Sequence, residues 1–182
     1  MHQVELAILD WIQSNLRTPF LDKAVAIFTQ MCDNGEIWII FAVILMLWKK
    51  TRQAGLSVGC GLLADLLIVN VTLKPLFGRI RPFAVNTAVE LLVEAPGSAA
   101  FPSGHTASSF AVVGALYACK SPLWKPVSVL AALMALSRLY LYVHWPTDII
   151  GGVVVGWFCG WLGTKIITWA KDALENRKKK AK

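Results

Sequence analysis

The chain has 182 residues, of which 56% are hydrophobic and 16% are charged, and its formal net charge is +7. This composition excludes a disordered chain, and the apolar content is too high for a chain of this length to bury in one water-facing core. We therefore expect an integral membrane protein. The basic surplus leaves nucleic acid and an anionic lipid surface as candidate partners.

The positions of the basic residues favour lipid over nucleic acid. One cluster consists of Lys49, Lys50 and Arg52, a second lies within residues 177–182, and each adjoins a long apolar stretch. The cytoplasmic flanks of membrane helices carry this kind of excess. We place both clusters on the cytoplasmic side of a bilayer and expect no nucleic acid partner.

The hydrophobic pattern predicts a single all-α domain over residues 1–182, with an N-terminal amphipathic segment before a six-transmembrane-helix bundle. The N-terminal segment is expected at 3–16, and the crossings at 18–33, 35–50, 53–74, 103–119, 123–142 and 147–170. A turn is expected at the Asp-Asn-Gly of residues 33–35, because Gly and Asn break helices and favour reversals. The first crossing is either a short tilted span or a second interfacial helix. The basic tail at 171–182 is expected to be solvated and frayed.

Charged residues interrupt the apolar segments at two places, Asp65 and Arg138. Ionisable groups at such depth usually face the bundle interior or a wet cavity, and we expect Asp65 to hydrogen-bond across the bundle, with binding of a substrate-linked cation or tuning of a pathway as the alternatives. With both basic clusters inside, alternation of the crossings places the 75–102 loop and the 143–147 turn outside. Arg79, in the outer loop, is expected to snorkel to lipid phosphates.

Small residues predict close packing between helices. Gly55 and Gly59 form one GxxxG pair, and Gly152, Gly156 and Gly160 repeat the spacing on one helical face. Helix backbones approach each other closely at such positions. The four cysteines lie far apart without a CxxC pair, so we expect them to pack as small hydrophobic residues rather than to form disulfides or a zinc site.

Unusual polar residues occur in three separated segments, at 74–82, 102–105 and 137–148. In the predicted topology all three lie at the outer ends of transmembrane helices. Random placement would spread them over both membrane faces. Because all three segments share one level of the membrane, we expect them to converge in one pocket.

The predicted pocket is suited to a phosphate group. Lys74, Arg81 and Arg138 would be costly near lipid unless a concentrated anion met them. Guanidinium groups offer paired donors to phosphate oxygens, and an ammonium group adds a compact charge. Ser103 and Gly104 are expected to add backbone donors at the start of a helix.

Two histidines, His105 and His144, belong to this pocket. One imidazole can attack phosphorus as a neutral nucleophile while the other, protonated, gives its proton to the leaving oxygen. A carboxylate four residues after His144, Asp148, would orient the attacking ring by fixing its tautomer. Covalent hydrolysis of a phosphate ester is therefore the expected chemistry.

These residues resemble the signature of the type 2 phosphatidic acid phosphatase superfamily, whose relatives include vanadium haloperoxidases. The signature reads K-x6-RP, then PSGH, then SR-x5-H-x3-D, and the resemblance spans residues 74–148. Every signature position is filled here, by Lys74, Arg81, Pro82, Pro102, Ser103, Gly104, His105, Ser137, Arg138, His144 and Asp148.

The resemblance implies a role for each residue. His144 would form a phosphohistidine, Asp148 would orient it, and His105 would be the acid for the leaving group. The residues implied to bind phosphate are Lys74, Arg81, Ser103, Gly104 and Arg138. No cofactor and no metal are expected, because the acidic residues do not cluster and the cations supply the charge that magnesium would otherwise provide.

The expected function is that of a lipid phosphatase in a bacterial plasma (inner) membrane, with its active site on the extracytoplasmic side. Undecaprenyl diphosphate is the substrate that the resemblance favours, giving undecaprenyl phosphate for cell wall biogenesis and inorganic phosphate. Phosphatidylglycerophosphate, phosphatidate and lipid A remain alternative substrates. A lipid-phosphate binding or transport protein without turnover is the alternative class.

Overall fold

The computed structural model describes residues 2–180, and over that range the chain is helical with no strand. The all-α prediction is therefore confirmed. The helices are α1 (His2–Leu16), α2 (Pro19–Gln30), α3 (Glu36–Leu47), α4 (Arg52–Asp65), α5 (Lys74–Phe77), α6 (Pro82–Val85), α7 (Gly104–Ala118), α8 (Trp124–Tyr140) and α9 (Pro146–Lys180). A 3₁₀ turn, η1 (Asp33–Gly35), precedes α3, and a π-helix, η2 (Leu66–Leu73), connects α4 to α5.

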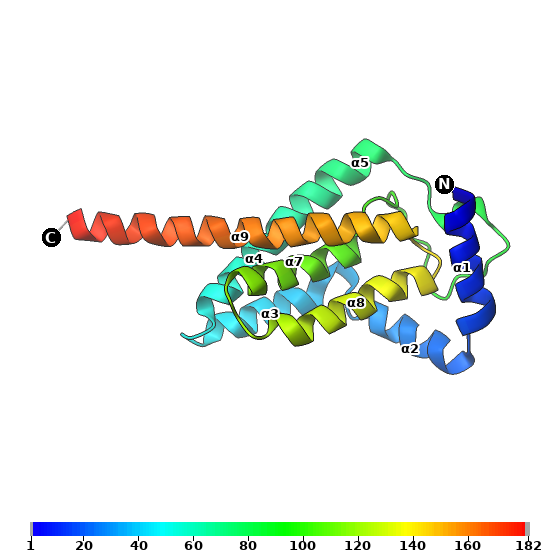
Figure 1. The fold of residues 1–182 in the computed structure, drawn as a ribbon, viewed down its shortest axis with the longest axis horizontal. Helices are drawn as coiled ribbons and strands as arrows, with labels where there is room; N and C mark the ends of the chain where they lie inside the picture. The colour runs from blue at the N-terminus through cyan, green and yellow to red at the C-terminus, as the bar shows by residue number, and fades with distance from the viewer. Residues whose placement is uncertain (1, 181–182) are drawn as a thin grey trace.

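The helices α3, α4, α7, α8 and α9 lie alongside one another, and α7 packs against α4, α8 and α9 (Figure 1). Helix α1 lies across the end of this bundle where α8 ends and α9 begins (Figure 1). The side chain of Gln13 fixes α1 there by donating a hydrogen bond to the Tyr140 carbonyl at 2.8 Å. The long connection between α6 and α7 lies at the same end of the bundle (Figure 1).

Local sequence signals explain where several helices begin. The Thr18 hydroxyl accepts a hydrogen bond from the Leu21 N–H at 3.2 Å, and Pro19 follows as the first residue of α2. Both features are typical of helix N-termini. Gly35 has a φ of +73° before α3, which confirms the turn expected at this position.

Two helical stretches are long and apolar enough to cross a membrane, Arg52–Val85 and Pro146–Lys180, and α3 is a shorter apolar helix. Large hydrophobic side chains are exposed on the outward faces of these helices, among them Leu63, Val71 and Val154. A surface of this kind is suited to lipid. The six-crossing topology and the interfacial role of α1 stay predictions.

Helix α9 is longer than the sequence predicted. It continues through the basic segment to Lys180, so the expectation of a frayed tail is wrong up to that residue, and residues 181–182 lie outside the described part of the chain. Residues with high helix propensity fill this stretch, and basic side chains in the last turn interact favourably with the helix dipole.

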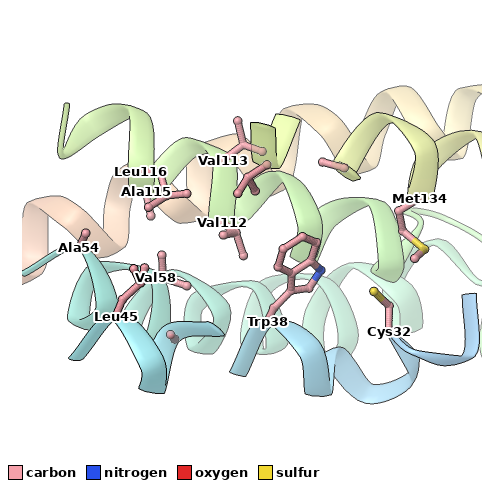
Figure 2. Packing of buried hydrophobic residues seen from close by; sticks show 13 residues of the cluster. Cys32, Trp38, Leu45, Ala54, Val58, Val112, Val113, Ala115, Leu116 and Met134 are labelled. Atoms are coloured by element: carbon pink, nitrogen blue, oxygen red, sulfur yellow. The ribbon is translucent and has the colours of Figure 1, made fainter. Parts of the chain in front are cut away.

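The central core joins α3, α4, α7 and α8 (Figure 2). Trp38, Val58, Val112 and Met134 are buried in it together with Cys32, which packs as a small hydrophobic residue. The indole N–H of Trp38 donates to the Ser109 hydroxyl at 3.0 Å, so the polar atom of this buried ring is satisfied.

Glycines bring α9 into direct backbone contact with α7, as the GxxxG spacing predicted. A Cβ at Gly156 would collide with the Ala107 carbonyl, and one at Gly160 with the Ala111 carbonyl. Gly152 would meet the Ser103 carbonyl oxygen at 2.9 Å. The residues that begin α7 are therefore held close to the first turns of α9.

Candidate active site

The three polar segments meet at one end of the bundle, around a cavity of about 410 Å³. The helices bring them together because α5, the start of α7, the end of α8 and the start of α9 all lie at this end. Of the residues predicted from the sequence, those lining the cavity are Lys74, Arg81, Gly104, His105, Arg138 and His144. Residues 93–98 of the long connection form another wall.

His144 lies in the short connection between α8 and α9 and is buried. Its Nδ1 is 3.3 Å from Asp148 Oδ2, and its Nε2 is 3.3 Å from Arg81 Nη1. Burial, reinforced by the charges of Arg81 and Arg138, lowers the pKa of His144 well below its usual value. The neutral ring is then fixed as the tautomer that donates from Nδ1 to Asp148 and presents the Nε2 lone pair to the guanidinium of Arg81.

Asp148 lies in the first turn of α9 and is completely buried. Its two carboxylate oxygens have different partners. Oδ2 faces His144 and accepts the Trp145 N–H at 2.9 Å, whereas Oδ1 accepts a hydrogen bond from Arg79 Nη1 at 2.6 Å. The carboxylate orientation is therefore fixed on both sides.

Backbone carbonyls hold Arg81 in place. Its guanidinium donates to the carbonyls of Val143 at 2.9 Å and Ser98 at 2.8 Å. Lys74 Nζ shares the Ser98 hydroxyl with Arg81, at 3.3 Å and 3.2 Å respectively. The two cations are thus placed side by side although α5 and the Gly78 turn separate them in sequence.

Arg138 approaches the cavity from α8. Its Nη1 donates to the Thr29 hydroxyl on α2, and its buried Nε has no hydrogen-bond partner within residues 2–180. A buried unpaired donor is costly in a protein interior. An anion in the cavity would satisfy it.

At the start of α7, Gly104 lines the cavity and the side chain of Ser103 does not. The Ser103 hydroxyl caps the helix by accepting from Thr106 N and Oγ1, at 3.5 Å and 3.0 Å. The Ser103 N–H already donates to the Asp148 carbonyl at 3.1 Å. A Cβ on Gly104 would lie 3.3 Å from Lys74 Nζ, so the absent side chain leaves room for a ligand beside the ammonium group.

His105 is the second residue of α7, and its Nε2 lies 3.0 Å from Asp33 Oδ1. Asp33 belongs to η1, the turn between α2 and α3. The sequence identified Asp33 only as a turn residue, because an isolated Asp-Asn-Gly gives no sign of a partner 72 positions away. The structure brings this carboxylate to the edge of the cavity as the partner of the second histidine.

Arg79 does not lie where the sequence placed it. Its guanidinium contacts Asp148, Thr147 and Glu5, so the expectation that it reaches for lipid phosphates is wrong. Opposite charges attract each other more strongly in the low dielectric of a protein interior than at a solvated surface. Arg79 lies between the signature residues Lys74 and Arg81, and this position could have pointed to the site.

A second, largely apolar cavity of about 570 Å³ adjoins the first. Side chains of α3, α4, η2 and α7 line it, and it shares Lys74, Gly104 and His105 with the cationic cavity. Asp65 lies in its wall, and Asp65 Oδ1 has no hydrogen-bond partner among the described residues, so the expected bond across the bundle from that atom is not formed. The two cavities therefore meet at these three shared residues.

The chain is similar to known proteins. The family model of the PAP2 superfamily matches residues 54–172, which include all three polar segments. YbjG of Escherichia coli (strain K12) is 38% identical over 131 residues, which cover 70% of this chain and 65% of that protein. The undecaprenyl-diphosphatase of Sulfolobus acidocaldarius is 29% identical over 145 residues, covering 79% of this chain and 70% of that protein.

A solved structure shares the fold. The crystal structure of Aquifex aeolicus LpxE superposes with a TM-score of 0.76 at 25% identity, covering 88% of this chain and 94% of that chain. The curated relatives are longer, and this chain spans 65% of the first and 70% of the second.

Proposed function

Because this chain belongs to the PAP2 superfamily, we propose that it is a membrane lipid phosphatase that removes the terminal phosphate of a lipid (di)phosphate. One observation carries the proposal: the cationic cavity and the apolar cavity meet at Lys74, Gly104 and His105. A phosphate headgroup is suited to the first cavity and a hydrocarbon chain to the second. The junction would then hold the bond that is broken.

The geometry supports catalysis through a phosphohistidine. His144 Nε2 attacks phosphorus, the bond from phosphorus to the leaving oxygen breaks, and His105 gives its proton to that oxygen. Water then attacks the phosphohistidine, His105 takes up a proton from this water, and the phosphorus–nitrogen bond breaks. Inorganic phosphate leaves and the His144 ring is neutral again.

The cations and Asp148 stabilise the charge that develops in each step. Lys74, Arg81 and Arg138 surround the place where the transferring phosphoryl group would lie, and preorganised donors of this kind lower the barrier most where charge accumulates. The Asp148 carboxylate stabilises the His144 ring as it becomes positive. An incoming phosphate oxygen would replace His144 Nε2 as the acceptor of the Arg81 hydrogen bond.

Undecaprenyl diphosphate is the substrate that we favour. The Sulfolobus acidocaldarius relative carries the name undecaprenyl-diphosphatase, and an apolar cavity beside a cationic one suits a lipid with a phosphate headgroup. The product would be undecaprenyl phosphate. The site would face the extracytoplasmic side of a bacterial plasma (inner) membrane, opposite the basic cluster that ends α9.

Phosphate release from purified protein in detergent micelles tests the proposal. Undecaprenyl diphosphate, phosphatidylglycerophosphate, phosphatidate and lipid A are compared at equal mole fraction. We expect turnover of at least one lipid and the highest kcat/KM with undecaprenyl diphosphate.

Two variants complete the test. His144→Ala should abolish release, whereas Arg17→Gln, which alters an ion pair outside the cavity, should retain it. Tight lipid binding without phosphate release would instead identify a binding protein. Release that survives in His144→Ala would refute the assigned nucleophile.

A further inference from the structure

A chain of charged groups extends from the candidate nucleophile to the N-terminal helix. Behind His144, the Asp148 carboxylate accepts from Arg79 Nη1 at 2.6 Å, and Arg79 Nη2 donates to Glu5 Oε2 at 2.8 Å. The other oxygen of Glu5 accepts the Thr147 N–H at 3.1 Å and the Thr147 hydroxyl at 2.6 Å. Helix α1 thereby contacts the start of α9 through the Glu5 carboxylate.

Burial of these charged groups is costly unless each charge is paired with an opposite one. Asp148 is fully buried, Glu5 is 5% exposed, and the Arg79 side chain is 20% exposed. An isolated carboxylate at the depth of Asp148 would take up a proton rather than stay charged. The guanidinium of Arg79 at 2.6 Å offsets this tendency.

The geometry assigns different tasks to the groups. Arg79 binds the Asp148 oxygen that does not face His144, which leaves the other oxygen turned toward the imidazole. Glu5 and Thr147 fix the guanidinium by accepting hydrogen bonds from its Nη2 and Nη1 atoms, respectively. The indole ring of Trp145 lies against Arg79, at 5.4 Å from ring centre to guanidinium carbon.

We infer that Arg79 is a positioning residue that keeps the Asp148 carboxylate ionised and turned toward His144, and that Glu5 of α1 acts through Arg79. The inference rests on the proposed function, because it concerns the orientation of the proposed nucleophile. It assigns α1, which lies outside the residues matched by the family model, a part in the active site.

Steady-state kinetics of the full-length protein against pH test the inference. Arg79→Gln removes the charge that favours the ionised carboxylate, so protons compete more strongly for Asp148. We expect kcat to fall about 10- to 100-fold with a smaller change in KM, the size of loss seen when an outer-shell group that orients a metal-bound histidine is removed. The acid limb of the kcat profile should move to higher pH.

A conservative variant separates charge from geometry. Arg79→Lys keeps the positive charge but loses the planar pair of donors. We expect its acid limb to stay near the wild-type position while kcat is reduced less than in Arg79→Gln. Because loss of folding would lower the active fraction without moving the pH profile, the profile distinguishes positioning from damage to the fold.

The role of Glu5 is tested in a double-mutant cycle. Glu5→Gln should lower kcat in the wild-type background and have little further effect in the Arg79→Gln background, because it acts through Arg79. The matched control is Arg17→Gln, which breaks the Arg17–Asp22 pair at 3.0 Å near α1 and should leave the profile unchanged.

The outcomes separate the two proposals. If the wild-type protein is active and Arg79→Gln has the same kcat and pH profile, the inference is overturned and the phosphatase proposal stays intact. Additive losses for Glu5→Gln and Arg79→Gln would overturn the part assigned to Glu5. Wild-type protein that releases no phosphate from any lipid would refute the proposed function and the inference with it.

Discussion

The contact between α7 and α9 holds the two histidine-bearing segments in register, and Gly156→Ala tests it. The added methyl group would collide with the Ala107 carbonyl oxygen and would lie 2.8 Å from the Ala107 carbonyl carbon. Backbone atoms cannot rotate away, so the two helices must separate. Overpacking of this kind costs about 1–3 kcal/mol, and we expect the upper end of that range here.

The matched control is Gly59→Ala, in the other GxxxG pair. A Cβ there would be 3.4 Å from the flexible end of Met46, which is an ordinary contact. Thermal unfolding in detergent should show Gly156→Ala melting about 6–12 °C below wild type. The expected cost is about 3 kcal/mol, and each kcal/mol lowers the melting temperature of a chain of this length by about 2–4 °C. Gly59→Ala should melt near the wild-type temperature.

Activity gives a second readout of the same variant. His105 lies in the first turn of α7 and Asp148 in the first turn of α9, so separating the helices should also reduce kcat at temperatures where the protein remains folded. Equal melting temperatures for Gly156→Ala and Gly59→Ala would refute the backbone contact. An unchanged kcat in a destabilised Gly156→Ala protein would refute its importance for the site.

Three further predictions concern the site itself. Asp33→Asn removes the charged partner of His105, and because the phosphate oxygen of undecaprenyl phosphate leaves more easily than the alkoxide of diacylglycerol, kcat should fall more for phosphatidate than for undecaprenyl diphosphate; equal losses would contradict the leaving-group role. Arg138→Lys keeps the charge but loses the planar donors, so kcat/KM should fall about tenfold or more, and an unchanged value would show that Arg138 does not bind phosphate. Because the pKa of His144 is lowered, this ring stays neutral as pH falls below about 6.5, so a burst of phosphoenzyme formation should persist there in rapid-quench experiments; loss of the burst with an apparent pKa near 6.5 would contradict the burial of the ring.

Much of the fold follows from local sequence. Apolar segments between turn residues predict the helices to within a few positions, because each is a long hydrophobic run that ends at residues such as Gly35 or Pro146. The close packing of α9 on α7 follows from Gly156 and Gly160. The length of α9 does not, because charge alone does not end a helix when residues with high helix propensity carry it.

The cavity was less completely predictable. The convergence of Lys74, His105 and His144 could be inferred because the topology places all three at one level. The partners that fix them could not, since Glu5 and Asp33 lie far away in the sequence and look like ordinary surface residues. Their roles depend on how α1 and η1 pack against the end of the bundle, which local patterns do not encode.

The central claim is that His144 attacks phosphorus, and trapping the covalent intermediate tests it most directly. Purified protein is mixed with lipid labelled in its terminal phosphate and quenched within milliseconds under alkaline conditions, which preserve phosphohistidine, and the labelled peptide is then sequenced. The label should be found on His144, should be absent from His144→Ala, and should disappear as phosphate is released. Label on another residue, or phosphate release with no labelled protein at any time, would contradict the account.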